Sequence, residues 1–207
     1  MTNQLSGRPI RLVEFMSVRV VAGTVNSMKW VTRAHVHVDR VACPWLIRRF
    51  VDPQAEFKFV VWPGTTLSAG DGTPFDFPDM DIPFTHHEGK CTFEALIGHY
   101  GLDDPVLSEM AAIIHGADVE KDIDKTPEAR GVELTLSGLA FVSNNDHQAL
   151  ERGFIICDSI YVGLLLRTLR KEMKGKTEGK SREDAFRLLH MHLRERLPRT
   201  IKVGPMK

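Results

Sequence analysis

Strand-like and helix-like segments are separated along this 207-residue chain, and that separation is the feature that most constrains its fold. Stretches with strand character come only before Pro63, in "AHVHVDR" and "AEFKFVVW". A Gly-, Pro- and Asp-rich loop follows from Pro63 to Pro83, with room for one short strand, and amphipathic helical spacing dominates after it. The chain is therefore predicted to be α+β, with a mainly helical body and a small β-sheet near the N-terminal part.

Around residue 40 the sequence changes from a period of two to a helical period. Alternation predicts a strand that places His35, His37 and Asp39 on one face and the two intervening valines on the other. The next stretch, "VACPWLIRRFVDP", has helical spacing and ends at "DP". Pro44 is tolerated best in a first helical turn, so this helix is expected to begin there, with Cys43 as its N-cap.

The later part of the chain carries clear helix signals. Thr92 is expected to cap a helix that ends at Gly101, and "DPVLSEMAAIIHGAD" is expected to form the next helix. "GVELTLSGLAFVS" and "HQALERGFIICDSIYVGLLLRTLRKEM" predict two or three more, and "SREDAFRLLHMHLRERL" a last, charged helix after the polar "KGKTEGK". We expect a disordered leader over residues 1–27, one domain over 28–172, and a linker with a C-terminal helical extension over 173–207.

Composition narrows the class of protein. Hydrophobic residues make up 43% and charged residues 26%, as in ordinary globular proteins. Basic and acidic residues number 27 each, which argues against a general nucleic-acid binder. Three widely spaced cysteines without a CxxC pair favour a reducing, cytoplasmic location. No apolar run reaches the roughly 18 residues of a membrane span, and no signal peptide is evident.

The stretch "FTHHEGKCTFEAL" concentrates residues that bind metals. His, Cys and carboxylate side chains are the usual ligands of transition metals, and this stretch holds His86, His87, Cys91 and Glu94. Adjacent histidines on an extended segment point apart unless a turn at Gly89 brings them together. Glu94 in a first helical turn is also favoured by the helix dipole alone. Spacing leaves a metal or ligand site and a plain polar loop both open.

Other polar pairs also have two interpretations. Cys43 as an N-cap beside Arg40 would have a lowered thiol pKa and attract anions, or it is a buried small residue. His115 and Asp118, three apart, could share a metal or a proton, or they cap helix ends. His35 and His37 form a weak metal pair. Further candidates are Asp146, which is expected first as an N-cap, and His147. No GxSxG, HExxH, Walker A or GxGxxG arrangement is present, and no nucleotide cofactor is expected.

Four stretches resemble the chromate-resistance protein family of the ChrB C-terminal domain type. They are "VDRVACPWLIRRFVDPQAEFKFV", "FTHHEGKCTFEALIGHYGLDDPVL", "AAIIHGADVEK" and "NNDHQALERGFIICDSIY", in the family's order, and the resemblance covers the chain from about Trp30 to Leu169. The resemblance implies a bacterial regulator or accessory protein of chromate resistance, encoded with a chromate efflux transporter. The polar residues at the matching positions are Asp39, Arg40, Cys43, Arg48, His86, His87, Cys91, Glu94, Asp118, Asp146, His147 and Asp158.

This sequence departs from the family pattern in three places. Regulators of the family carry a further N-terminal domain, whereas only about 27 residues precede the motifs here, so DNA binding is doubtful. Cys157 and Asp158 stand where a Tyr-Asp pair is expected. The charged segment after Lys174 lies beyond the shared region and predicts a peripheral helix or an oligomer contact.

Three hypotheses follow. In the first, the protein binds or senses chromate, a related oxyanion or a metal ion, through Arg40, Cys43, Arg48, His86 and His87. In the second, a metal-dependent redox or hydrolytic enzyme holds Mn, Fe or Zn with His86, Glu94, His115 and Asp118. In the third, the protein is a regulatory scaffold without a small-molecule site. Carboxylates gathered around a histidine would favour a metal, and clustered arginines an oxyanion.

Overall fold

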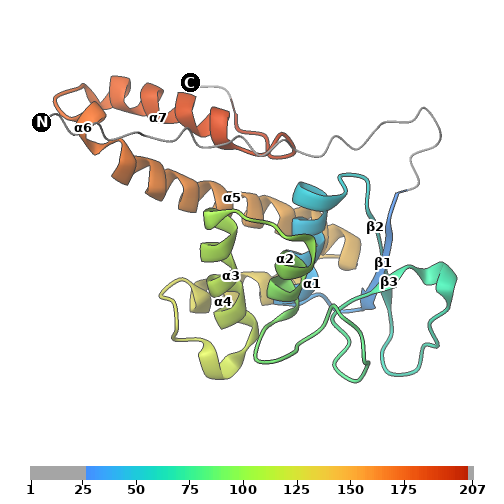
Figure 1. The fold of residues 1–207 in the computed structure, drawn as a ribbon. Coiled ribbons are helices and arrows are strands. Elements are labelled where there is room, and N and C mark those ends of the chain that lie inside the picture. The colour runs from blue at the N-terminus through green and yellow to red at the C-terminus, as the bar shows by residue number, and fades with distance from the viewer. Residues whose placement is uncertain (1–26, 205–207) are drawn as a thin grey trace, which may run out of the picture.

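The computed structural model describes residues 27–204, so the predicted leader lies outside the described residues except for its last member. A small parallel sheet lies at one side of a helical body, which confirms the α+β prediction (Figure 1). In the sheet, β1 (Lys29–Arg33) is central, between β2 (Glu56–Val60) and β3 (Thr73–Pro74). Parallel neighbours need a long crossover, and α1 (Val38–Leu46) with the π-helical η1 (Ile47–Val51) supplies it between β1 and β2.

The sheet is covered on both faces. Trp30 packs against Phe75 and Phe84, which join it to the main core under the helices. Val31 points the other way, into a smaller cluster with Val60 and Phe77 beneath the long loop. This loop contains the short η2 (Ala69–Asp71) ahead of β3.

The helix α1 (Val38–Leu46) is the centre of the core. It packs against the four helices that follow the loop, α2 (Thr92–Tyr100), α3 (Pro105–Asp118), α4 (Ala129–Val142) and α5 (Asp146–Glu172). Its residues are buried from end to end apart from Arg40, which is half-buried. Gly153 of α5 allows a close approach to α1, since an added Cβ would lie 2.3 Å from Val41 Cγ1.

Two expectations about this region are wrong. Residues 35–39 do not form a strand, because His35 has a left-handed backbone (φ 63) that ends the extended segment and the helix begins at Val38. The apolar residues of this helix repeat with helical spacing from Val38 onward. The short alternation around Val36 and Val38 resembles a strand, so the sequence did not indicate where the helix begins. The helix therefore does not begin at Pro44, which lies inside α1, and Cys43 is a fully buried mid-helix residue rather than an N-cap. The π-helical η1 (Ile47–Val51) follows and ends before "DP".

The helices after the loop follow the sequence closely. The cap of α2 is Cys91 rather than Thr92, one residue earlier than expected, and Gly101 ends α2 with a left-handed φ of 58°. Asp104 caps α3, which is followed by the 3-10 turn η3 (Glu120–Asp122). The N-cap of α5 is Asn145, so the expectation for Asp146 is wrong by one residue.

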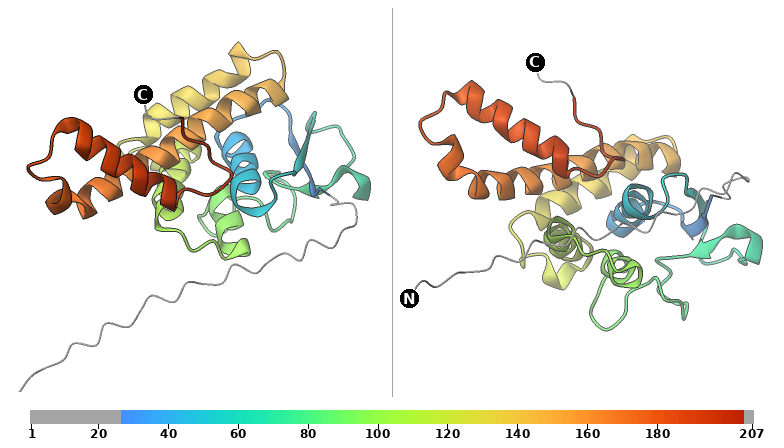
Figure 2. Two further views of the ribbon diagram at one scale, coloured as in Figure 1. Left: turned by 90° about the horizontal axis from the view of Figure 1, so that it is seen from above. Right: turned by 45° about the horizontal axis from the view of Figure 1, so that its top comes forward.

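The C-terminal segment folds back on the long helix. "KGKTEGK" holds the short α6 (Lys174–Thr177), and α7 (Arg182–Arg196) then packs along α5 (Figures 1 and 2). The predicted last helix is present at the edge of the molecule. Among residues 27–204, no helix combines the length and apolar character that a membrane crossing requires.

Candidate metal centre

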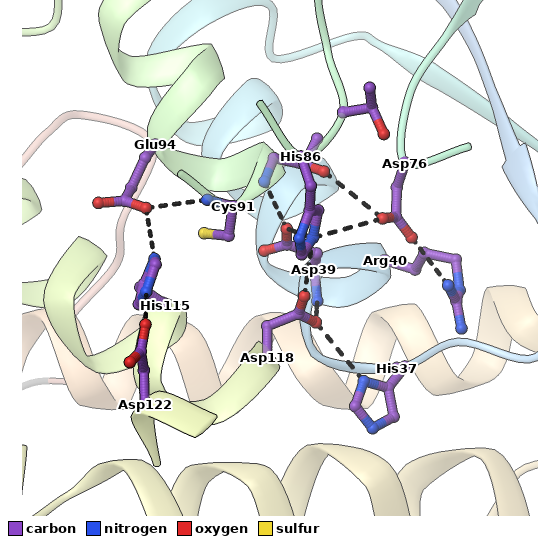
Figure 3. A network of polar contacts seen from close by, with 12 residues as sticks. His37, Asp39, Arg40, Asp76, His86, Cys91, Glu94, His115, Asp118 and Asp122 are labelled. Atoms are coloured by element: carbon purple, nitrogen blue, oxygen red, sulfur yellow. Dashed lines mark hydrogen bonds and ion pairs between the residues drawn. The ribbon is translucent and has the colours of Figure 1, made fainter. Parts of the chain in front are cut away.

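Four polar side chains from separate parts of the chain converge beside the first turn of α1 (Figure 3). Asp39 comes from that turn, Asp76 from the loop after β3, His86 from the loop before α2, and Asp118 is the last residue of α3. We call these four residues the acidic site. Consecutive members are between 10 and 37 residues apart in sequence, so the fold alone brings them together.

One ring nitrogen of His86 is the focus of the acidic site. His86 Nε2 lies 3.0 Å from Asp118 Oδ2, 3.4 Å from Asp39 Oδ2 and 4.0 Å from Asp76 Oδ1. Ligand atoms of Asp39, Asp76 and His86 all lie within 4.8 Å of one another. Three carboxylates thus approach a single imidazole from three directions.

The carboxylates use their remaining atoms to join the surrounding elements. Asp39 Oδ2 accepts the backbone N–H of Thr92 at 2.7 Å, which docks the start of α2 on α1. Asp118 Oδ1 accepts the backbone N–H of Asp39 at 3.1 Å, an otherwise free donor in the first turn of α1. His37 Nδ1 lies 3.5 Å from the same Asp118 oxygen.

Positive charge is distributed unevenly over the acidic site. Arg40 and Arg33 both pair with Asp76 Oδ2, at 2.8 and 3.0 Å. Asp39 is 1% exposed, and its Oδ1 has no hydrogen-bond partner among the described residues. A buried carboxylate oxygen without a donor is costly, so the site has unused capacity for a cation.

Burial and mutual repulsion set the protonation states. Burial and the nearby charge of Asp118 raise the pKa of Asp39 to about 7. The contacts with Asp118 and Asp39 raise the pKa of His86 to about 10, so its ring is an imidazolium at neutral pH. Burial raises the pKa of Asp118, but the contacts with His37 and His86 outweigh it and hold this pKa below its usual range. A cation already stands among the carboxylates, in the form of protonated His86.

The acidic site is open to solvent on two sides. The His86 side chain is 42% exposed. On the α3 side, His37 and Asp118 line a cleft of about 660 Å³, together with Ala117, Glu120, Ile123, Arg130 and Glu133. An ion can therefore reach the carboxylates, and a small molecule has room beside them.

A second polar group lies next to the first, across the start of α2. His115 Nδ1 is 2.7 Å from Glu94 Oε2, and His115 Nε2 is 2.8 Å from Asp122 Oδ2. Cys91 lies beside this pair, and its backbone N–H donates to Glu94 Oε2 at 2.9 Å. We call Cys91, Glu94, His115 and Asp122 the thiol cluster (Figure 3).

The metal ligands expected from the sequence are divided between these two groups. His86 and Asp118 lie in the acidic site, whereas Glu94 and His115 lie in the thiol cluster. His115 and Asp118 are three residues apart on α3, yet each contacts a different group. The structure thus brings the four expected residues close together but not around one point.

The residues expected to bind an oxyanion are dispersed. Arg40 is held by Asp76 and by the carbonyl of His35. Arg48 donates to the carbonyl of Ala55 and stacks on Phe57 and Phe154. His87 Nε2 contacts the carbonyl of Ile82 at 2.7 Å. Burial, with nearby Asp39, raises the pKa of the Cys43 thiol far above its usual value, so it stays protonated.

Other family-motif residues have structural contacts. Asp158 binds Trp45 Nε1 at 2.8 Å and both the Nε and the Nη2 of Arg49, at 2.9 and 2.7 Å. Asp146 accepts the backbone N–H groups of His35 and Val36. His147 packs edge-on against Phe59. These contacts hold the β1–α1 segment and η1 to α5.

Sequence reasoning did not single out Asp76 or Asp122. Asp76 lies in a loop of many Asp, Gly and Pro residues, where no spacing distinguishes one carboxylate from another. Asp122 follows α3 in a charged stretch of the same kind. Asp39 is among the polar residues of the family motif but was not predicted as a ligand.

Fold and site together define a class: an α+β protein with a histidine-centred acidic site at the junction of its sheet and helices. The sequence model of the ChrB C-terminal domain family matches residues 30–164, so the chain belongs to this family. The match confirms the resemblance seen in the motifs. Protein ChrB of Cupriavidus metallidurans is 39% identical over 136 residues, which are 64% of this chain and 40% of that relative. The chain thus spans less than half of that relative's length. No solved structure matches.

Proposed function

We propose that this chain serves chromate resistance by binding a divalent metal cation at the acidic site. The observation that carries the proposal is the convergence of three carboxylates on His86 Nε2, at 3.0, 3.4 and 4.0 Å, with an unpartnered buried oxygen on Asp39. Two metal-bound atoms at bond lengths of about 2.0–2.2 Å are themselves roughly 3–3.5 Å apart. The separations of His86 Nε2 from Asp118 Oδ2 and Asp39 Oδ2, 3.0 and 3.4 Å, lie in this range.

Charge favours a cation over a chromate-like oxyanion. A dianion needs Arg, imidazolium and free N–H donors around it. At the acidic site Arg40 and Arg33 both bind Asp76, and Asp39 and Asp118 would repel an anion. Carboxylate and imidazole ligands suit Mn²⁺, Fe²⁺ or Zn²⁺. We therefore assign the principal ligands as Asp39, His86 and Asp118, with Asp76 at the edge.

The proposal is tested by titrating Mn²⁺ and Zn²⁺ into the metal-stripped full chain by calorimetry. His86→Ala removes the central ligand, whereas His87→Ala removes the exposed neighbouring ring and is the matched control. We expect His86→Ala to lose the binding heat of the acidic site and His87→Ala to keep it. Equal binding by both variants would exclude the acidic site.

A second candidate, a metal-dependent redox or hydrolytic enzyme, is favoured by the cleft that His37 and Asp118 line. Catalytic metal sites keep a coordination position open to water or substrate, whereas structural sites are closed. Relaxation of bulk water protons by bound Mn²⁺ distinguishes the two. Strong relaxation would support an open, catalytic position, and weak relaxation a closed binding site.

A further inference from the structure

The thiol cluster contains a donor set different from that of the acidic site. One ligand atom each from Cys91, Glu94 and His115 lie within 4.8 Å of one another. Cys91 and His115 are buried, and Glu94 is half-buried. The set combines a thiol, a carboxylate and an imidazole, which is a mixture typical of transition-metal sites.

Asp122 orients the imidazole of this cluster. His115 Nε2 contacts Asp122 Oδ2 at 2.8 Å, so this nitrogen donates its N–H outward, and Nδ1 faces Glu94 at 2.7 Å. A histidine that binds a metal through one ring nitrogen usually donates the other N–H to a carboxylate. Asp122 occupies the place of that supporting carboxylate.

The backbone holds Cys91 and Glu94 in place independently of any ligand. Cys91 is the N-cap of α2, and Glu94 closes a capping box by accepting the Cys91 N–H. Thr92, the next residue, donates its N–H to Asp39 of the acidic site. The same helical turn therefore positions donors for both groups.

We propose that Cys91, Glu94 and His115 form a second, thiolate-containing site for a borderline-soft divalent cation such as Zn²⁺, with Asp122 as a positioning residue. The thiolate distinguishes its preference from that of the acidic site, whose oxygen-rich set suits harder ions. Binding displaces the Cys91 proton and one proton of His115, and both are released to solvent. The site is separate from the one in the proposed function.

Co²⁺ is the probe that separates the two sites, because thiolate-to-cobalt charge transfer absorbs in the near ultraviolet. Saturated wild-type chain is expected to bind two Co²⁺ and to show this band. Cys91→Ser is expected to lose the band and one ion. Since Ser is a good N-cap, this variant keeps the start of α2, and an unchanged far-ultraviolet circular dichroism spectrum checks this. Cys157→Ala, at a buried cysteine of α5, is the control and should retain both ions.

His86→Ala is expected to keep the band and lose one ion. A wild type that binds one Co²⁺ with the band would overturn the acidic site and support the thiol cluster. A wild type that binds one Co²⁺ without the band would overturn the thiol cluster as a site and support the acidic site. A band that persists in Cys91→Ser would overturn the second site, and the cluster would then be only a capping and hydrogen-bond network.

Discussion

Two aspartates that anchor polar groups in the fold, the half-buried Asp158 and the buried Asp39, have their charges balanced differently. Asp158 meets three donors, from Trp45 and Arg49, and both of its oxygens are paired. Asp39 lies between two other aspartates, has one oxygen without a hydrogen-bond partner in the described part of the chain, and faces His86 Nε2 at 3.4 Å. The first arrangement joins α1 and η1 to α5. The second leaves a buried Asp39 oxygen without a donor from the described residues, which is a position that a bound cation would satisfy.

The largest effect is expected at Asp118. In Asp118→Asn one oxygen can still accept the Asp39 N–H, so α1 keeps its start, but the charge facing His86 is lost. Supporting residues around a metal typically contribute 10–100-fold, so loss of a ligand should weaken Mn²⁺ binding by at least about 100-fold. Calorimetric titration measures this, with Asp124→Asn, an exposed aspartate, as control. An affinity within about threefold of wild type would remove Asp118 from the site.

Asp158→Ala should act on stability instead of binding. It leaves Trp45 Nε1 and the Arg49 guanidinium without their partner in a half-buried position, which costs about 2–3 kcal/mol of unfolding free energy. Urea denaturation followed by circular dichroism measures the loss. Mn²⁺ affinity under native conditions should not change. If it fell as far as in Asp118→Asn, the contrast between the two groups would fail.

Asp39→Asn should raise the free energy of unfolding at high pH, whereas Asp158→Ala lowers it. The folded-state pKa of Asp39 is raised to about 7 from 3.8, so this residue's contribution to stability is fully present below pH 3.8 and lost as pH rises through 7. The metal-free Asn variant should therefore be more stable than wild type at pH 9, by about 1–3 kcal/mol, and little different at pH 4. Denaturation at both pH values checks this. A variant less stable at pH 9 would show that Asp39 is structural.

The smallest expected effect is the change in Mn²⁺ affinity per pH unit. His86 is protonated up to pH 10, and a cation must displace this proton. Mn²⁺ affinity should rise about tenfold per pH unit between pH 7 and 9, and more steeply below 7, where Asp39 also holds a proton. Titrations in buffers of increasing pH measure the slope. A flat profile would mean that the ion binds without His86.

Much of the helical body could be predicted from the sequence, because caps and apolar spacing act locally. Gly101, Asp104 and Pro105 mark the end of α2 and the start of α3 at the positions where the structure has them. The start of α1 was missed since Val36 and Val38 alternate like a strand, and only the left-handed His35 shows where the strand ends.

The acidic site could be predicted only in part. His86 and Asp118 were candidates because of their residue types and motifs. Asp76 was not, because its place depends on pairing across the sheet: the Phe75 N–H donates to the Val31 carbonyl and so carries the next residue to the site. No pattern within the loop encodes that contact. The separation of Glu94 and His115 from His86 likewise depends on how α2 and α3 pack.

The most direct test of the acidic site is an anomalous-difference map from crystals of the full chain grown with Mn²⁺, collected at the manganese absorption edge. The account predicts a peak bounded by Asp39, His86 and Asp118, with Asp76 at its edge, and no such peak in crystals of His86→Ala. Bound manganese found only elsewhere, with His86 still between Asp39 and Asp118, would contradict it.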